Sequence, residues 1–309
     1  MARLAVAGLG LGLFAWTIAD AGPETLLSLL PRAAALLPLA IALEAARIGL
    51  DALSTRAVLA GRGAIPFRAL FAAQLAAQGV MGVFPAGRSA SEATKAALLS
   101  SHVGVPAAVA MGTANQANVL IGSALFSLAC LAGAMATTDG IALPIAIGIH
   151  FAVLTAAGVG LRVLATHPGI EAFFLRRAPR LGARAGAFHE ASRDTPVLAP
   201  APIAWMVAGR AVQTLEYWVL ARAVGLDVSA AGALAVQGVN LVAAALGVMV
   251  PGQLGTAELV FRQSAEALGT DHATAVAIAL LARVPQLTWV GTGLVVLLVW
   301  QARRRAGTA

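Results

Sequence analysis

Long apolar runs, separated by short polar stretches, make up most of this chain of 309 residues. A helix needs about 20 mainly apolar residues to cross the hydrocarbon core of a bilayer. Runs of about this length or longer predict membrane helices over residues 2–19, 32–60, 105–135, 141–164, 203–224 and 272–301. Two further stretches, residues 67–102 and 230–268, begin apolar and are then interrupted by proline and glycine. We therefore predict an all-α integral membrane protein: one polytopic domain over residues 1–309, a helical bundle with two broken, re-entrant hairpins.

The two interruptions share one pattern. The sequence is PAGRSASE at residues 85–92 and PGQLGTAE at residues 251–258, so that a glutamate follows the proline by seven positions in both. The motifs are 166 residues apart, and the same offset aligns Gln74 with Asn240 and Glu44 with Arg210. Several matches at one offset indicate a duplicated unit. We assign residues 32–135 to the first repeat half and residues 203–301 to the second.

Proline and glycine are expected to break the backbone at both motifs, at Pro85, Gly87, Pro251, Gly252 and Gly255. Inside a bilayer, irregular backbone is tolerated only where protein or water covers it. A carboxylate there is costly and usually marks a functional position. Broken segments in corresponding positions of two halves point to the binding site of a transporter. A helix that starts after either proline would direct free N–H groups toward an anion.

The composition agrees with a membrane protein and excludes several other classes. Hydrophobic residues make up 59% of the chain and charged residues 11%, with a mean hydropathy of +0.84, whereas soluble domains have about 25% charged residues. The apolar runs are too long and uniform for barrel strands. With one cysteine, Cys130, and scattered histidines, neither a disulfide nor a metal site is expected. No nucleophile-elbow, phosphate-loop or zinc-protease motif occurs, so we expect no enzyme activity and no cofactor.

The basic excess predicts the orientation of the chain rather than a nucleic-acid partner. The net charge is +7 and the isoelectric point about 11.3. The excess lies in short stretches beside the apolar runs, which is typical of cytoplasmic loops. These stretches hold Arg3, Arg62, Arg68, the arginines of residues 176–193, and Arg303, Arg304 and Arg305. We therefore expect a multi-pass protein of the bacterial plasma (inner) membrane with both termini in the cytoplasm.

With this orientation, the first broken unit enters from the cytoplasm and the second from outside, which makes the halves an inverted-topology repeat. The length leaves a full crossing open as well, because the 18 residues from 67 to 84 would rise about 27 Å as a helix. Between the halves, residues 167–202 form a basic cytoplasmic connector with interspersed aromatic residues. We interpret it either as an amphipathic segment lying on anionic headgroups or as a solvated linker.

A carboxylate and a base lie one helical turn apart after each break. Lys95 follows Glu92 by three positions and Arg262 follows Glu258 by four, so each pair can share one face of a helix. In the functional interpretation, the two glutamates converge in a polar cavity near the bilayer midplane and take up protons, while Arg88, Lys95 and Arg262 contact a phosphate. In the structural interpretation, each pair only neutralises itself within its helix.

Other polar residues lie inside the apolar runs. The amides are expected to line the same cavity or to hydrogen-bond neighbouring helices; they include Gln74 and Asn240. Charges in mid-bilayer are costly and are expected to pair. Those assigned to structural ion pairs are Glu44, Arg47 and Glu216. Those assigned to the cavity, with a structural ion pair as the alternative, are Arg210 and Arg283.

The two motifs resemble those of a known membrane family. Pro85-x-Gly87-x-x-x-Ser91-Glu92 with Lys95, and Pro251-Gly252-x-Leu254-Gly255-x-x-Glu258, are similar to the paired motifs of the lysylphosphatidylglycerol synthase transmembrane family. The resemblance covers nearly the whole chain. This family is the flippase-like membrane domain of bacterial multiple peptide resistance factors. The resemblance implies a helical bundle with two re-entrant elements that moves lipids between leaflets. It does not imply lipid lysylation, because the aminoacyl-transferase domain of the fused members is absent here.

Two places depart from the family pattern. Ser91 stands where the family often has a glycine before the first glutamate. Asn115 and Gln116, further candidates for the cavity, stand where a glutamate–arginine pair is common. These differences put a shared ion-coupling scheme, or a shared lipid headgroup, in question.

Together these features predict a lipid translocator that moves a polar or anionic lipid between leaflets by alternating access. Glu92 and Glu258 would act as gating or protonatable groups. The expected partner is a membrane lipid, and a homodimer and envelope-lipid biosynthetic enzymes are further candidates. Two other functions stay open: an ion-coupled small-solute transporter, and a non-catalytic membrane scaffold for envelope-lipid synthesis.

Overall fold

The computed structural model describes residues 2–62, 64–167, 169, 179–193 and 198–307, and their regular secondary structure is entirely helical. Within these described residues, three helices are long and apolar enough to cross a membrane: α6 (Val105–Thr137), α7 (Ala142–Thr166) and α13 (His272–Arg305). A fourth span results if α2 (Pro23–Ala34) and α3 (Leu37–Val58), bent by 75° at the break between them, are taken together. The all-helical membrane fold is therefore confirmed.

The segment before α3 differs from the prediction. Residues 20–31 were expected to be a link and residues 32–60 one helix, but α2 runs from Pro23 through Arg32 and α3 starts at Leu37. Proline is accepted in the first turn of a helix, where its missing N–H is not needed. Pro23 and Pro38 occupy such positions, so each starts a new helix.

Two other predicted membrane helices, α1 (Ala2–Ala21) and α10 (Pro200–Ala223), form as well. The segment Gly10–Ala21 of α1 is an apolar helix of shorter length, and α10 is not apolar enough to count as a span. For α10 the reason lies in the charges that it carries, namely Arg210, Glu216 and Arg222.

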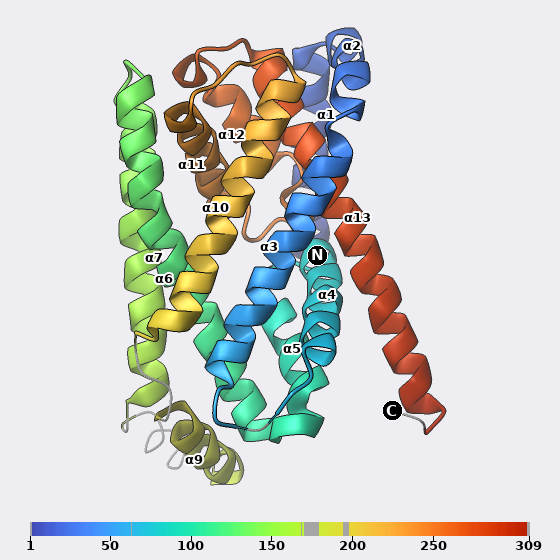
Figure 1. Ribbon diagram of the computed structural model, residues 1–309, viewed down its shortest axis with the longest axis vertical. Coiled ribbons are helices and arrows are strands. Elements are labelled where there is room, and N and C mark those ends of the chain that lie inside the picture. The colour runs from blue at the N-terminus through green and yellow to red at the C-terminus, as the bar shows by residue number, and fades with distance from the viewer. Residues whose placement is uncertain (1, 63, 168, 170–178, 194–197, 308–309) are drawn as a thin grey trace.

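The first broken unit consists of α4 (Phe67–Val83) and α5 (Gly87–Val103), which pack against each other. In Figure 1 both lie in the half of the bundle that carries α9 (Pro179–Arg193) and the C-terminus, and the chain turns between them near mid-height. Ala86 has a left-handed backbone with φ of 51°. A Cβ atom on Gly87 would lie 2.1 Å from the carbonyl oxygen of Met81, so this turn requires glycine.

The second broken unit lies in the opposite half of the bundle (Figure 1). It contains α11 (Ala230–Leu246), the short 3₁₀ turns η1 (Pro251–Gln253) and η2 (Glu266–Leu268), and α12 (Thr256–Gln263). The predicted glycines are needed, because Gly252 and Gly255 have φ of 56° and 77°. A Cβ on Gly255 would also lie 2.4 Å from the carbonyl oxygen of Gly10, so α1 packs directly on this break.

Small residues bring the first broken unit close to the last helix. A Cβ on Gly293 of α13 would lie 2.0 Å from the carbonyl oxygen of Leu75 of α4, and one on Gly79 would lie 2.6 Å from the backbone nitrogen of Leu294. Membrane helices associate through such small positions, which let backbones approach. On the other side of the bundle, α3 packs along α10, and α6 along α7.

The connector between the halves is described only in part. α9 packs against the ends of α6 and α7. Residues 170–178 and 194–197, with two of the predicted membrane-facing arginines, Arg176 and Arg177, lie outside the described residues. The membrane-surface interpretation of this connector stays a prediction.

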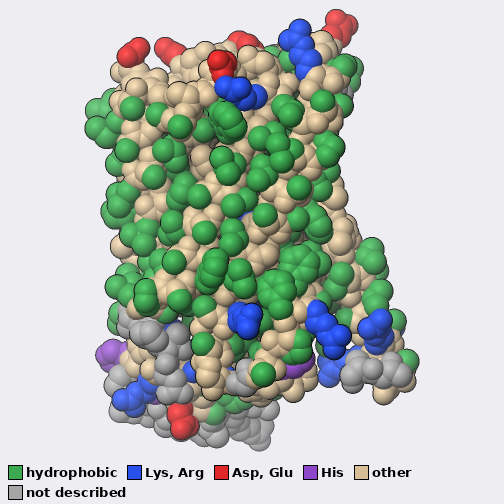
Figure 2. Space-filling model, in the orientation of Figure 1, with side chains coloured by type: hydrophobic (Ala, Val, Ile, Leu, Met, Phe, Trp, Pro, Cys, Tyr) green, Lys and Arg blue, Asp and Glu red, His purple; other side chains and the backbone are tan. Residues whose placement is uncertain are grey.

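The outer surface is that of a membrane-embedded body. In Figure 2, hydrophobic side chains cover the middle of the bundle. Most Asp and Glu side chains on this face lie at one end, beside some Lys and Arg, and Lys and Arg predominate at the other end. Large apolar side chains on the outside include Leu125, Leu128, Ile145, Ile149, Val153, Leu287, Val295 and Leu298. These residues lie on α6, α7 and α13, the helices that can span the membrane.

Candidate functional site

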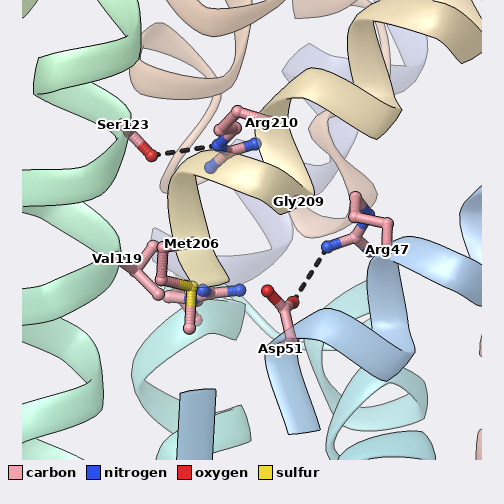
Figure 3. Close-up of a pocket in the computed structure, with 8 residues that line it drawn as sticks. Arg47, Asp51, Val119, Ser123, Met206, Gly209 and Arg210 are labelled. Carbon is pink, nitrogen blue, oxygen red and sulfur yellow. Dashed lines mark hydrogen bonds and ion pairs between the residues drawn. The ribbon is translucent and has the colours of Figure 1, made fainter. Parts of the chain in front are cut away.

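A small polar pocket lies where α3, α5, α6 and α10 meet (Figure 3). It is lined by Arg47, Asp51, Arg88, Val119, Ser123, Met206, Gly209 and Arg210. The volume open to the centre of a water molecule is about 10 Å³, enough for about one water. The pocket brings together three guanidinium groups in the interior of the bundle.

On α3, Arg47 is held by two carboxylates of its own helix. Its Nε and Nη2 donate to the two oxygens of Glu44, both at 2.6 Å, and Nη1 donates to Oδ2 of Asp51 at 3.0 Å. All three side chains are buried. The predicted ion pair of Glu44 and Arg47 is therefore present, and Asp51 completes a triad that neutralises this arginine with one negative charge to spare.

Arg210 and Arg88 have neutral partners instead. Arg210 donates from Nε to Oγ of Ser123 at 3.0 Å and from Nη1 to Oε1 of Gln213 at 2.7 Å. Nη1 of Arg88 lies 3.8 Å from the sulfur of Met81, and its buried Nε has no hydrogen-bond partner. Neither arginine forms an ion pair among the described residues. Two positive charges therefore face one pocket without a contacting carboxylate.

A chain of side-chain hydrogen bonds links Arg210 to the second broken unit. Gln213 Oε1 also accepts from Nε2 of Gln237 at 3.0 Å, and Oε1 of Gln237 accepts from Nδ2 of Asn240 at 3.4 Å. Oδ1 of Asn240 accepts from the hydroxyl of Tyr217 at 2.8 Å, and the Tyr217 ring stacks on Phe261 of α12. Asn240 of α11 thus forms a hydrogen bond to a neighbouring helix, α10, which was one of its two predicted roles. A role in a cavity stays a prediction.

Sequence reasoning missed Gln213, Tyr217 and Ser123. Gln213 and Tyr217 follow Arg210 by three and seven positions, so they continue one face of α10. That spacing could have identified both. Ser123 has no such signal, because its contact with Arg210 depends on how α6 packs against α10.

The predicted pair of Glu258 and Arg262 does not form. Glu258 lies at the third position of α12, and its Oε2 accepts from the backbone N–H of Gly255 at 2.9 Å. Both of its oxygens accept from Arg283 of α13, at 2.9 and 3.0 Å. Arg283 also donates to the carbonyl oxygens of Gly252 and Gln253. The carboxylate is thus turned toward the helix start, away from Arg262.

Arg262 lies on the outer side of α12. Its Nε donates to Oδ2 of Asp20 at 2.6 Å, and its guanidinium stacks over the ring of Trp16. Arg262 therefore ties α12 to α1. It does not line the pocket.

The pair of Glu92 and Lys95 forms, as the spacing of three positions predicts. Nζ of Lys95 lies 2.8 Å from Oε1 of Glu92, and both side chains are buried. The expected meeting of Glu92 with Glu258 in one cavity stays a prediction; neither acid lines this pocket. Each acid is paired with a base from its own half of the chain, Lys95 or Arg283.

Glu216 was expected in an ion pair and is not found in one among the described residues. It lies on α10 and is 2% exposed. Its Oε2 has no hydrogen-bond partner. Arg47, on the helix α3 that packs along α10, is already occupied by Glu44 and Asp51.

A sequence model described as the lysylphosphatidylglycerol synthase TM region matches residues 1–304. The chain belongs to this family. It is thus a membrane protein of a family related to lipid handling. No curated protein and no solved structure matches the chain.

The residues expected to depart from the family pattern lie on α5 and α6, where Ser91 and Asn115 are buried and Gln116 is half-buried. Ser91 is 2% exposed, and Nδ2 of Asn115 donates to Oγ1 of Thr55 at 2.9 Å. The carbonyl oxygens of the Asn115 and Gln116 side chains have no partner, and neither has Oε1 of the buried Gln74. These amides leave unused hydrogen-bond acceptors inside the bundle, and their predicted role in transport stays a prediction. Among the described residues, no three metal-binding side chains cluster.

Proposed function

We propose that this protein is a lipid translocator that moves a phosphate-bearing anionic lipid between the leaflets of the bacterial plasma membrane, without catalysis. The observation that carries the proposal is the pair of guanidinium groups, Arg88 and Arg210, that face one buried pocket with only neutral partners. Both arginines are half-buried, and a charge that is partly withdrawn from water costs free energy unless it is compensated. An anion between the two arginines would supply that compensation.

A phosphate suits this pocket for geometric reasons. Guanidinium groups present planar, paired donors that match phosphate oxygens. Arg88 also lies in the first turn of α5, where backbone N–H groups add partial positive charge. Ser123 offers a further hydroxyl at the pocket wall. The acyl chains would stay in the bilayer, next to the apolar outer surface.

The size of the pocket supports alternating access. A space for about one water cannot hold a headgroup, so the bundle must open on one side for a lipid to enter. We propose that the broken units, α4–α5 and α11–α12, are re-entrant elements of an inverted repeat that open in turn. Their glycines at positive φ and the left-handed Ala86 are places where the backbone can change direction. The basic end of the bundle, with the C-terminus, would face the cytoplasm.

The test is leaflet-resolved transport in proteoliposomes. The purified protein is reconstituted with fluorescent phosphatidylglycerol, and a membrane-impermeant quencher reports the outer-leaflet fraction over time. The replacements Arg88→Gln and Arg210→Gln are expected to reduce the rate toward that of empty vesicles. Arg222→Gln is the matched control, because this arginine lies on the same helix but is exposed, with a side-chain exposure of 49%.

A phosphate-free glycolipid of equal chain length separates headgroup recognition from general leakage. It should move no faster than in empty vesicles. If the parent and a variant that carries both Arg88→Gln and Arg210→Gln move phosphatidylglycerol at the same rate, the arginine pocket is not the lipid site. If the parent protein moves every tested lipid no faster than it moves in empty vesicles, the protein is not a translocator, and a scaffold role is favoured.

A further inference from the structure

Two buried carboxyl groups, Glu44 of α3 and Glu216 of α10, face each other near the arginine pocket. Ser54 of α3 donates to the carbonyl oxygen of Pro202, and Gly209 of α10 lies against Asp51, so the helices run antiparallel in a register that brings Glu216 opposite Glu44. Each carboxyl group is 2% exposed, and Oε2 of Glu216 has no hydrogen-bond partner. Carboxylates accept hydrogen bonds but cannot donate them unless one carries a proton. Two ionised carboxylates in contact away from water repel strongly, so such pairs hold a shared proton.

In the part of the chain that the structure describes, no second cation forms an ion pair with either glutamate. Arg47 of α3 binds Glu44 and Asp51, and Arg210 and Tyr217 lie on α10 itself. From α13 and α12, Arg283 and Glu258 are paired with each other, with Nε of Arg283 2.9 Å from Oε1 of Glu258.

 The other helices packed against α3 and α10 contribute no further charge: α6 and α11 contain no charged residue, Arg68 of α4 is exposed, and so are Glu24 and Arg32 of α2.

The charges around the pocket then depend on one proton. Its three arginines, Arg47, Arg88 and Arg210, carry three positive charges, and Glu44, Asp51 and Glu216 carry three negative charges when all are ionised. With a proton shared by the two glutamates, the centre has one net positive charge. A phosphodiester brings one negative charge, so the protonated centre becomes neutral when it binds the lipid, and the deprotonated centre becomes negative.

Neutral complexes are favoured in a medium of low dielectric constant. Proton binding and anion binding must therefore strengthen each other, by the reciprocity of linked equilibria. We propose that the Glu44–Glu216 pair is a proton-binding site coupled to the arginine pocket, so that one proton crosses the membrane with each anionic lipid. This inference rests on the proposed lipid translocation. The proton comes from the water on one side and is released to the water on the other, and no covalent bond changes.

The test uses the same proteoliposomes with a pH gradient. In the parent protein, fluorescent phosphatidylglycerol should accumulate in the leaflet that faces the alkaline side, because protons run toward that side. At one proton per lipid, a gradient of about one pH unit sustains a leaflet ratio of up to about tenfold. The ratio should return to its value without a gradient when an ionophore that exchanges protons for potassium is added.

The Glu216→Gln variant should still exchange lipid without a gradient but should lose the gradient-driven accumulation. The control is Glu266→Gln, an exposed carboxyl at the end of the bundle, which should accumulate lipid like the parent. If Glu216→Gln accumulates lipid as the parent does, the inference is overturned. If the parent exchanges lipid but ignores the gradient, the inference is overturned and the translocator function stands. If the parent exchanges no lipid, both fall.

A measurement on the parent alone covers the case in which Glu216→Gln does not fold. Short-chain phosphatidylglycerol is titrated into the detergent-solubilised protein by calorimetry in buffers of different ionisation enthalpy. The slope of the binding enthalpy against ionisation enthalpy gives the number of protons taken up. Uptake of a proton on binding supports the coupling, and a slope of zero overturns it.

Discussion

Arg283 joins the second break of the chain to the last helix, and its replacement by methionine tests how that break is held. Arg283 contacts both oxygens of Glu258 and the carbonyl oxygens of Gly252 and Gln253. Methionine keeps much of the side-chain length and removes the charge and every donor. The change therefore removes one ion pair and two carbonyl contacts in a single step.

The size of the effect follows from what is left behind. Glu258 has no exposed surface, and a buried carboxylate that loses its cation costs about 3–5 kcal/mol. Each carbonyl that loses a donor adds about 1 kcal/mol. The double variant Arg283→Met with Glu258→Gln removes the orphaned charge, and an amide can still accept from the N–H of Gly255. Its loss should be about 2 kcal/mol, the part that belongs to the two carbonyls.

The free energy of unfolding is measured by SDS titration in mixed micelles. Arg222→Met serves as the control, because its ion pair with Asp227 is exposed and such pairs contribute about 0–1 kcal/mol. We expect Arg283→Met to be the least stable, the double variant to recover part of the loss, and the control to match the parent. A double variant less stable than Arg283→Met would refute the reasoning, since it would show that Glu258 does not depend on this cation.

Two further changes test the backbone and a helix cap. Gly87→Ala should destabilise the protein by about 1–3 kcal/mol, because the new Cβ meets the carbonyl oxygen of Met81. Gly49→Ala, with no atom within 4 Å of its Cβ, should be neutral or stabilising in the same SDS titration, and equal losses would count against a steric requirement at Gly87. Asp271→Ala should cost about 1 kcal/mol at pH 7, because Asp271 accepts from the backbone N–H and the hydroxyl of Thr274 at the start of α13. Those hydrogen bonds hold the pKa of Asp271 below 3.8, so the loss should shrink as the pH falls below about 3.8 and the carboxylate is protonated in both states. A loss that stays constant down to pH 2 would show that the charge is not involved.

The sequence predicts the broken units well because proline and glycine act locally. The first unit was predicted to begin at residue 67 and to break at Pro85, and α4 runs from Phe67 to Val83 before α5 starts at Gly87. Helix α2 escaped prediction for a related reason. Pro23 lies in the stretch that was predicted to be a polar link, residues 20–31, although a proline in the first turn favours a helix start.

The pocket itself could not be predicted, because its members come from four helices far apart in the chain. Spacing within a helix identifies Arg47 with Glu44, but it says nothing about Arg210 and Ser123, which are 87 positions apart. Which cations stay without a carboxylate depends on helix packing. The offset that aligns Glu44 with Arg210 indicated that both belong to related positions, and the structure places their helices, α3 and α10, side by side.

Glu258 shows how two local rules can compete at one residue. Spacing of four positions favours a pair with Arg262, but Glu258 is also the third residue of α12, where a glutamate bends back to the N–H of the residue that caps the helix. The cap takes precedence, since α12 starts at the buried Gly255, whose N–H needs an acceptor inside the protein. Once the carboxylate points to the helix start, only a cation from another helix can reach it. Arg283 does so across 25 positions and binds the two carbonyls of the break as well. An acid just after a proline–glycine break is therefore better assigned first to its own helix start, and its cation sought elsewhere in the chain.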